Sequence, residues 1–216
     1  MDEVLSIEEV TFNQRESVLF DRVSLVLKSG DVVRIDGSNG TGKTTLLKII
    51  TGMIIPDSGK VTWNNKSIYK LKEDYYSNII YLGHKLALKY DLTVSENLQF
   101  YYSLKSSDKK YLILKPILDK LNLTDYSHSL VKILSEGQKR RIALARLWFS
   151  SAQLWILDEP FTAIDKDLKS KLNELFDNHI NNGGMILYTS HNETIKNSIL
   201  FRVDNDPMAQ EVRETE

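Results

Sequence analysis

The sequence contains no cysteine, which excludes disulfides, iron–sulfur ligation and cysteine-based zinc sites. It also lacks an excess of charge of either sign, since 28 Lys and Arg residues stand against 29 Asp and Glu residues. Nothing in that balance favours a nucleic-acid partner, so we expect none. The absence of cysteine is typical of a reducing compartment, and we expect the protein in the cytoplasm.

Long apolar runs are absent as well. No run approaches the roughly 20 residues that a membrane-spanning helix needs, and the first residues lack the basic and apolar regions of a signal peptide. We therefore expect no direct membrane insertion and any membrane contact to be made through partner proteins. The 216 residues have room for one α/β domain, 1–216, with a subdomain inserted in it.

A glycine-rich turn lies between an apolar run and a helical pattern. Val32–Ile35 predicts a buried strand, and residues 44–51 predict a helix that stops at Gly52. Glycines let backbone N–H groups point at phosphates, Lys43 can reach the β- and γ-phosphates, and the Thr44 hydroxyl suits Mg²⁺. The pattern predicts an ATP site, with an ordinary turn as the alternative. Its residues are Gly37, Ser38, Asn39, Gly40, Thr41, Gly42, Lys43, Thr44 and Thr45.

Two carboxylates follow a second apolar run. Leu154–Leu157 predicts a central parallel strand that ends in Asp158 and Glu159, and Met185–Thr189 predicts a second such strand. We expect Asp158 to hold Mg²⁺ through water and Glu159 to be the general base for the attacking water. A solvated acidic turn is the alternative, which the preceding apolar run disfavours.

The remaining pattern is strand-rich before residue 64 and helical after residue 75. We expect a capping box from Thr93 to Glu96 and a frayed acidic tail at residues 211–216. The other expected elements are strands at 4–12, 18–27 and 60–63 and helices at 95–104, 113–121, 138–149 and 167–180.

Between the phosphate loop and the acidic strand end lies Leu-Ser-Glu-Gly-Gln, residues 134–138. These three motifs in this order resemble the ATP-binding cassette superfamily over nearly the whole chain. The resemblance implies a P-loop NTPase fold with a parallel core sheet, an antiparallel β subdomain and an inserted α-helical subdomain at about residues 75–142. It also implies a homodimer around two ATPs, in which these signature residues contact the partner's ATP: Ser135, Glu136, Gly137 and Gln138. Taken alone, the run favours a simple helix cap.

The same resemblance assigns further residues. His191 corresponds to the switch histidine that contacts the γ-phosphate and Glu159, and Asp165 to the loop that crosses to the partner's site. No aromatic residue falls cleanly where the superfamily usually stacks adenine, which is a departure from its pattern; Arg15 is the candidate for stacking there, with Phe12 as the alternative.

Two further positions depart from the superfamily's usual residues. Glu136 replaces a glycine, and we expect its side chain to point toward Lys139 or Arg140 and away from phosphate. His84 stands where the switch loop usually has glutamine, and its imidazole can make one hydrogen bond there.

These departures resemble the residues found in one family, the haem-exporter ATPases of cytochrome c maturation. The shared features are Gly37-Ser-Asn-Gly, Leu-Gly-His84, Glu96-Asn97-Leu98 and, most specific, the runs 138–148 and 154–163. The resemblance implies a haem-transporting ATPase, with ATP and Mg²⁺ as cofactors, whose ATP hydrolysis drives haem export or the release of haem from, or its loading onto, a periplasmic haem chaperone. It would lie peripherally on the cytoplasmic face of the inner membrane, with integral membrane subunits as partners and haem handled only through them.

Two other functions remain open. The ATPase subunit of a drug or lipid exporter would share this catalysis but dock on a different membrane partner. A cassette protein that acts on ribosomes or DNA usually has two cassettes or a long coiled-coil insertion, and 216 residues hold neither.

Overall fold

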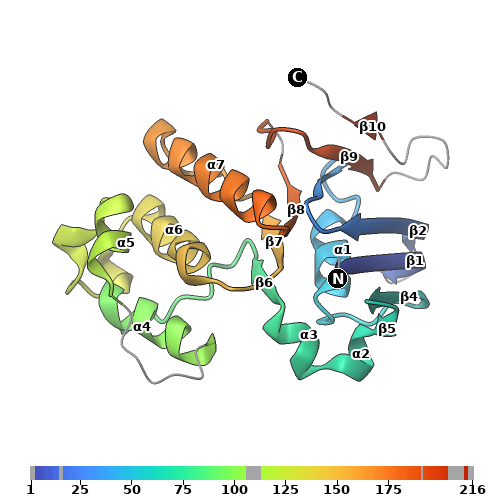
Figure 1. The fold of residues 1–216 in the computed structure, drawn as a ribbon, viewed down its shortest axis with the longest axis horizontal. Helices are drawn as coiled ribbons and strands as arrows, with labels where there is room; N and C mark the ends of the chain where they lie inside the picture. The colour runs from blue at the N-terminus through green and yellow to red at the C-terminus, as the bar shows by residue number, and fades with distance from the viewer. Residues whose placement is uncertain (1–2, 15–16, 106–112, 191, 204–211, 214–216) are drawn as a thin grey trace. The chain divides into compact units, whose positions relative to one another are not determined.

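The computed structural model describes residues 3–14, 17–105, 113–190, 192–203 and 212–213, beginning with an antiparallel sheet (Figure 1). Its strand order is β2 (Ser17–Lys28), β1 (Val4–Gln14), β4 (Ser58–Trp63) and β5 (Lys66–Ser67). Along β1, Ile7 and Val10 are both buried although three positions separate them. A bulge at Glu9, with φ 48°, supplies the extra residue that keeps both side chains on the buried face.

A second sheet carries the candidate site. Its order is β10 (Val212–Arg213), β9 (Ile199–Arg202), β3 (Val32–Asp36), β8 (Met185–Thr189), β7 (Leu154–Asp158) and β6 (Ile79–Leu82). The strands from β9 to β6 are parallel. Every residue of β7 and β8 is buried, as expected for the middle of a parallel sheet, and the two strands predicted here are confirmed.

The helix α1 (Lys43–Ile50) follows β3 and packs its apolar residues into the main core. Leu46, Leu47, Ile49 and Ile50 are fully buried in one cluster with residues of both sheets. Two short helices, α2 (Ile68–Leu71) and α3 (Glu73–Ser77), lead into β6. The Tyr75 hydroxyl of α3 donates to the Ile50 carbonyl at 2.7 Å, which satisfies a carbonyl at the end of α1.

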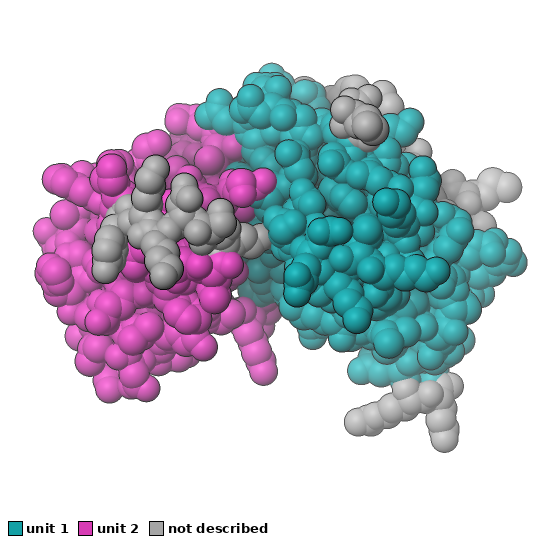
Figure 2. All heavy atoms as spheres, turned by 60° about the horizontal axis from the view of Figure 1, so that its bottom comes forward, with its two compact units in different colours: residues 1–83, 152–160, 176–216 teal, residues 84–151, 161–175 magenta. Residues whose placement is uncertain are grey.

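The chain divides into two compact units, drawn in different colours in Figure 2. Unit 1 comprises residues 1–83, 152–160 and 176–216, and unit 2 comprises residues 84–151 and 161–175. Residues 75–83 belong to unit 1, since β6 pairs with β7. Among the described helices, none has both the length and the apolar character needed to cross a membrane.

Unit 2 is helical. It contains α4 (Val94–Lys105), α5 (Lys115–Lys120), α6 (Glu136–Ala145) and 3₁₀ turns at Thr124–Tyr126, Val131–Ile133 and Arg146–Phe149. The helix α7 (Lys166–Asn181) begins in unit 2 and ends in unit 1. The predicted capping box before α4 is confirmed, because Glu96 accepts from the Thr93 N–H at 2.8 Å while the Glu96 N–H donates to the Thr93 hydroxyl at 3.2 Å.

Two elements differ in detail from the expectations. The helix predicted over 138–149 begins earlier, at Glu136, and tightens to a 3₁₀ turn from Arg146, a common ending for α-helices. Within the tail expected to fray, Val212 and Arg213 instead form β10 and pair with β9, while residues 211 and 214–216 lie outside the described part of the chain. An outer strand offers free backbone donors and acceptors, and this short segment uses them.

Candidate functional site

The glycine-rich loop joins β3 to α1 in unit 1. Gly42 precedes α1 with φ 95°, a left-handed conformation that favours glycine. A Cβ at this position would also lie 2.7 Å from side-chain atoms of Leu19. No acidic residue occupies the first turn of α1, so the partial positive charge of the helix N-terminus is left for an anion.

The ammonium group of Lys43 lies over the same loop. Its Nζ donates to the Gly37 carbonyl at 2.5 Å and to the Ser38 carbonyl at 3.0 Å. The loop is closed further by the Thr41 hydroxyl, which donates to the Ser38 carbonyl at 2.9 Å. The predicted phosphate-binding residues therefore form one compact turn, and the ammonium group of Lys43 is hydrogen-bonded to carbonyls of that turn.

The Asp158 carboxylate is held by two hydroxyl groups from different elements. Thr44 Oγ1 donates to Asp158 Oδ2 at 3.0 Å, and Thr189 Oγ1 donates to Asp158 Oδ1 at 2.8 Å. Asp158 is 4% exposed and Thr189 is fully buried. A buried carboxylate needs such donors, and these two place the group beside the first turn of α1.

Glu159 continues the chain with a sharp change of direction. Its φ is 54°, in the left-handed region that non-glycine residues rarely adopt, and its N–H donates to the Thr189 hydroxyl at 3.0 Å. The two adjacent carboxylates thus leave the strand in different backbone conformations. Different backbone conformations are compatible with the different roles predicted for the two carboxylates, which stay a prediction.

The donors present fit Mg²⁺. A hydroxyl and a carboxylate from Thr44 and Asp158 are the oxygen ligands that this ion prefers, and the Thr44 oxygen keeps lone pairs while its proton bonds Asp158. Within the described part of the chain, no group of three or more His, Asp or Glu side chains could hold a metal.

The signature residues begin α6 in unit 2. Ser135 is the N-cap: its hydroxyl accepts from the Gln138 N–H at 3.2 Å, and its own N–H donates to Gln138 Oε1 at 2.9 Å. Glu136 points to Lys139, whose Nζ lies 2.8 Å from its carboxylate, in one of the two directions expected. A Cβ at Gly137 would meet only Ala163 O, at an ordinary 3.5 Å, so packing within the described residues does not require glycine there.

The remaining candidate residues lie on several different elements. Asp165 accepts from the Leu168 N–H at 2.9 Å, which caps α7, and it pairs with Arg141 within unit 2. His84 is exposed. Phe12 is half-buried and packs against Phe20, with ring centroids 6.2 Å apart. Arg15 and His191 lie outside the described residues.

Two residues near Asp158 were missed by the sequence reasoning. The sequence pattern predicts Thr189 only as the end of a strand. The available signal for a further role was a polar residue at the end of an apolar strand. Tyr81 of β6 pairs in register with Ile156, so its side chain and Asp158 share the α1 face of the sheet. Burial, and after it the Asp158 charge, raises the pKa of Tyr81 to about 12.

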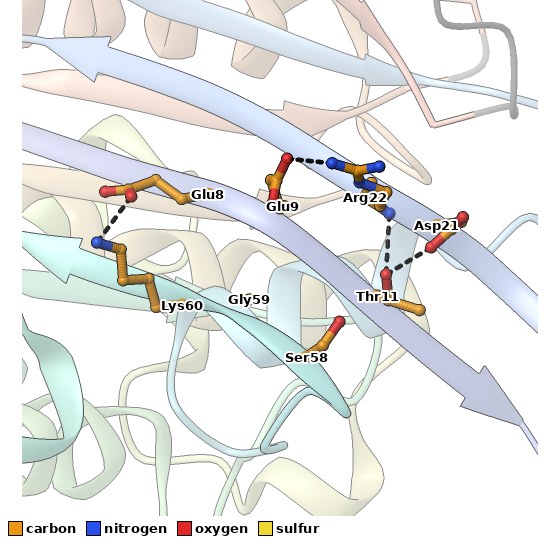
Figure 3. Close-up of a pocket in the computed structure, with 8 residues that line it drawn as sticks. All are labelled: Glu8, Glu9, Thr11, Asp21, Arg22, Ser58, Gly59 and Lys60. Atoms are coloured by element: carbon orange, nitrogen blue, oxygen red, sulfur yellow. Dashed lines mark hydrogen bonds and ion pairs between the residues drawn. The ribbon is translucent and has the colours of Figure 1, made fainter.

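A hollow on the antiparallel sheet is a poor alternative site (Figure 3). Its lining is Glu8, Glu9, Thr11, Asp21, Arg22, Ser58, Gly59 and Lys60. Arg22 pairs with Glu9 at 2.5 Å and Lys60 with Glu8 at 2.8 Å. Because both cations have acidic partners and Asp21 adds a third carboxylate, the hollow does not suit a triphosphate.

Comparison with known proteins gives consistent relatives. The family model described as ABC transporter matches residues 20–162. The chain is 46% identical over 195 residues to the cytochrome c biogenesis ATP-binding export protein CcmA of Histophilus somni, covering 90% of each chain. The protein of the same name from Haemophilus influenzae is 45% identical over 189 residues, covering 88% of this chain and 89% of the relative.

A solved structure resembles the whole fold. It is the dimeric structure of an ATP-binding cassette in a post-hydrolysis state bound to ADP and Pi. The TM-score is 0.82 at 22% sequence identity, covering 97% of this chain and 98% of that one. This likeness confirms the predicted fold class.

Proposed function

This chain belongs to the ABC transporter family of ATP-binding proteins, and we propose that it hydrolyses ATP for a membrane complex that exports haem during cytochrome c biogenesis. The observation that carries the ATPase function is a chain of hydrogen bonds that runs from Thr44 through Asp158 and Thr189 to the Glu159 N–H. It joins the phosphate loop to both carboxylates within unit 1. The relatives of 42–46% identity, all named for cytochrome c biogenesis and export, support the biological role.

Hydrolysis divides among the residues as follows. Lys43 and the N-terminus of α1 hold the phosphates, and Thr44 would supply a hydroxyl ligand for Mg²⁺ while Asp158 would hold the ion through water. Glu159 accepts a proton from the attacking water. The water oxygen bonds to the γ-phosphorus as the bond from that phosphorus to the bridging oxygen of ADP breaks, leaving ADP and phosphate.

The second half of each site comes from another copy in this proposal. Ser135 presents a hydroxyl at the N-terminus of α6, and Gly137 leaves space beside it that its own chain does not need. Both features suit the close approach of a phosphate from a head-to-tail partner. We keep His191 as a γ-phosphate contact, His84 as the switch-loop residue and Arg15 as the adenine contact.

The partners follow from the same proposal. Integral membrane subunits bind this chain at the cytoplasmic face of the inner membrane, and haem passes through them. The chain acts as one ATPase domain in which the helical unit is an insertion, as the division into two units supports.

A haem stain of c-type cytochromes in the native host tests the biological role. Lys43→Ala, expressed at the wild-type level, should abolish covalent haem attachment, because the phosphates lose their main cation. Lys48→Ala removes a lysine further along α1 and should leave the staining normal. Normal staining in a Lys43→Ala strain whose protein lacks ATPase activity would reject the haem role and favour a drug or lipid exporter.

A further inference from the structure

We propose that Thr189 is a positioning residue, whose hydroxyl sets both the orientation of the Asp158 carboxylate and the backbone turn that carries Glu159. The inference rests on the proposed ATPase function. Thr189, at the end of β8, holds the Asp158 carboxylate and the proposed base Glu159 in fixed positions relative to each other.

The hydroxyl of Thr189 is used in both directions. It donates to Asp158 Oδ1 at 2.8 Å and accepts from the Glu159 N–H at 3.0 Å. Thr189 and Asp158 are direct partners in the register of β8 and β7, so their side chains leave the sheet on the same face. Only a group that is donor and acceptor at once can make both bonds from one atom.

The two bonds act on different parts of the site. With Oδ1 bound by Thr189 and Oδ2 by Thr44, the plane of the Asp158 carboxylate is fixed by hydroxyls on both sides. The bond from the Glu159 N–H stabilises a left-handed backbone, at φ 54°, that a residue with a side chain otherwise avoids. Losing the hydroxyl would therefore loosen both carboxylates together.

Packing alone does not explain a threonine at this position. Thr189 is fully buried, and the four residues before it in β8, Met185 to Tyr188, are Met, Ile, Leu and Tyr. Valine has almost the same shape, favours strands equally and would avoid burying a hydroxyl. The cost of burying this polar group is offset only because both of its bonds are made to the site.

The test compares Thr189→Val, which removes the hydroxyl, with Thr189→Ser, which keeps it. The full chain is isolated with its co-purifying membrane subunits, and kcat, KM for ATP, the Mg²⁺ concentration for half-maximal activity and ATP binding in EDTA are measured. Thr62→Val makes the same change at a buried threonine of the antiparallel sheet and is the matched control. Glu159→Gln reports whether turnover depends on the proposed base.

Thr189→Val should lower kcat on the order of 10- to 100-fold, because misplaced catalytic groups slow chemistry strongly. KM and ATP binding in EDTA should stay within about twofold, and Thr189→Ser should retain most of the wild-type kcat. The half-maximal Mg²⁺ concentration should rise in Thr189→Val only. Thr62→Val should match the wild type throughout.

A kcat for Thr189→Val within about twofold of wild type, or a Thr189→Ser variant as slow as Thr189→Val, overturns the inference. If Glu159→Gln is inactive in that same experiment, the ATPase proposal is retained and only the inference about Thr189 is rejected. Wild-type activity that does not depend on Glu159 overturns both. Should Thr189→Val not fold, Thr189→Ala is judged by the same criteria.

Discussion

At the scale of single residues, Gly83 is needed for space and not for its backbone conformation. Its φ is outside the left-handed region, yet a Cβ there would lie 2.6 Å from the hydroxyl oxygen of Tyr81. In the parallel register, Leu82 pairs with Leu157, so Gly83 is level with Asp158. Gly83 therefore leaves space for the Tyr81 hydroxyl at the position along the sheet where β7 carries Asp158.

Gly83→Ala should lower the free energy of unfolding by about 1–3 kcal/mol, since the new methyl group must displace the Tyr81 ring. Urea denaturation measures the change. Tyr81→Val in the same chain should recover part of the loss by removing the ring. Gly137→Ala is the control: its Cβ has space, so stability should change by less than about 0.5 kcal/mol. A Gly83→Ala protein of wild-type stability would mean that the ring moves aside freely.

At the scale of elements, α7 and two strands enclose a histidine. The His179 ring stacks on Trp155 of β7, with centroids 3.8 Å apart and planes at 9°, and its Nε2 lies 3.3 Å from the Met185 carbonyl of β8. Burial lowers the pKa of His179, and the carbonyls of Met185 and Gln153 oppose that shift only in part. The folded state therefore disfavours the imidazolium.

This histidine makes stability depend on pH. Because the folded pKa lies below the ordinary value of about 6.5, the unfolded chain binds the proton more tightly. The contribution is fully present above pH 6.5 and is lost as the pH falls below that value toward the folded pKa. Urea denaturation between pH 7.5 and 5 should show falling stability, and His179→Phe, which keeps a stacking ring, should flatten the slope.

His128→Gln, at an exposed histidine of unit 2, controls for a general effect of losing an imidazole. It should retain the wild-type slope. Equal slopes for wild type and His179→Phe would show that another group causes the pH dependence.

The elements also show how far the sequence could be interpreted. Apolar runs predicted β3, β7 and β8, and the glycine-lysine-threonine pattern placed the start of α1, because these signals are local. The bulge at Glu9 and the strand β10 depend on pairing with distant segments. The role of Thr189 was hidden for the same reason, since it arises only when β8 lies beside β7.

At the scale of the whole molecule, the proposed site needs two copies of the chain. Its chemical groups lie in unit 1, whereas Ser135 begins a helix of unit 2. Glu159→Gln should bind ATP but hydrolyse it slowly, so that the chain accumulates as an ATP-bound dimer. Light scattering should then give twice the monomer mass with Mg²⁺ and ATP, and the monomer mass without nucleotide.

Adding Ser135→Asp to Glu159→Gln should prevent that dimer. Aspartate is a good N-cap and preserves the start of α6, but its charge repels a phosphate. Ser103→Asp adds the same charge at an exposed serine of α4 and should leave dimerisation intact. A dimer that tolerates Ser135→Asp would place the subunit contact elsewhere.

The hydroxyl–carboxylate–hydroxyl chain around Asp158 also has an evolutionary consequence. Thr44 and Asp158 are 114 positions apart, and Asp158 and Thr189 are 31 apart, yet the three share two hydrogen bonds. Losing either threonine hydroxyl removes a donor from the buried Asp158 carboxylate. We therefore expect substitutions at these two distant positions in related lineages to keep a hydroxyl group wherever the carboxylate is kept.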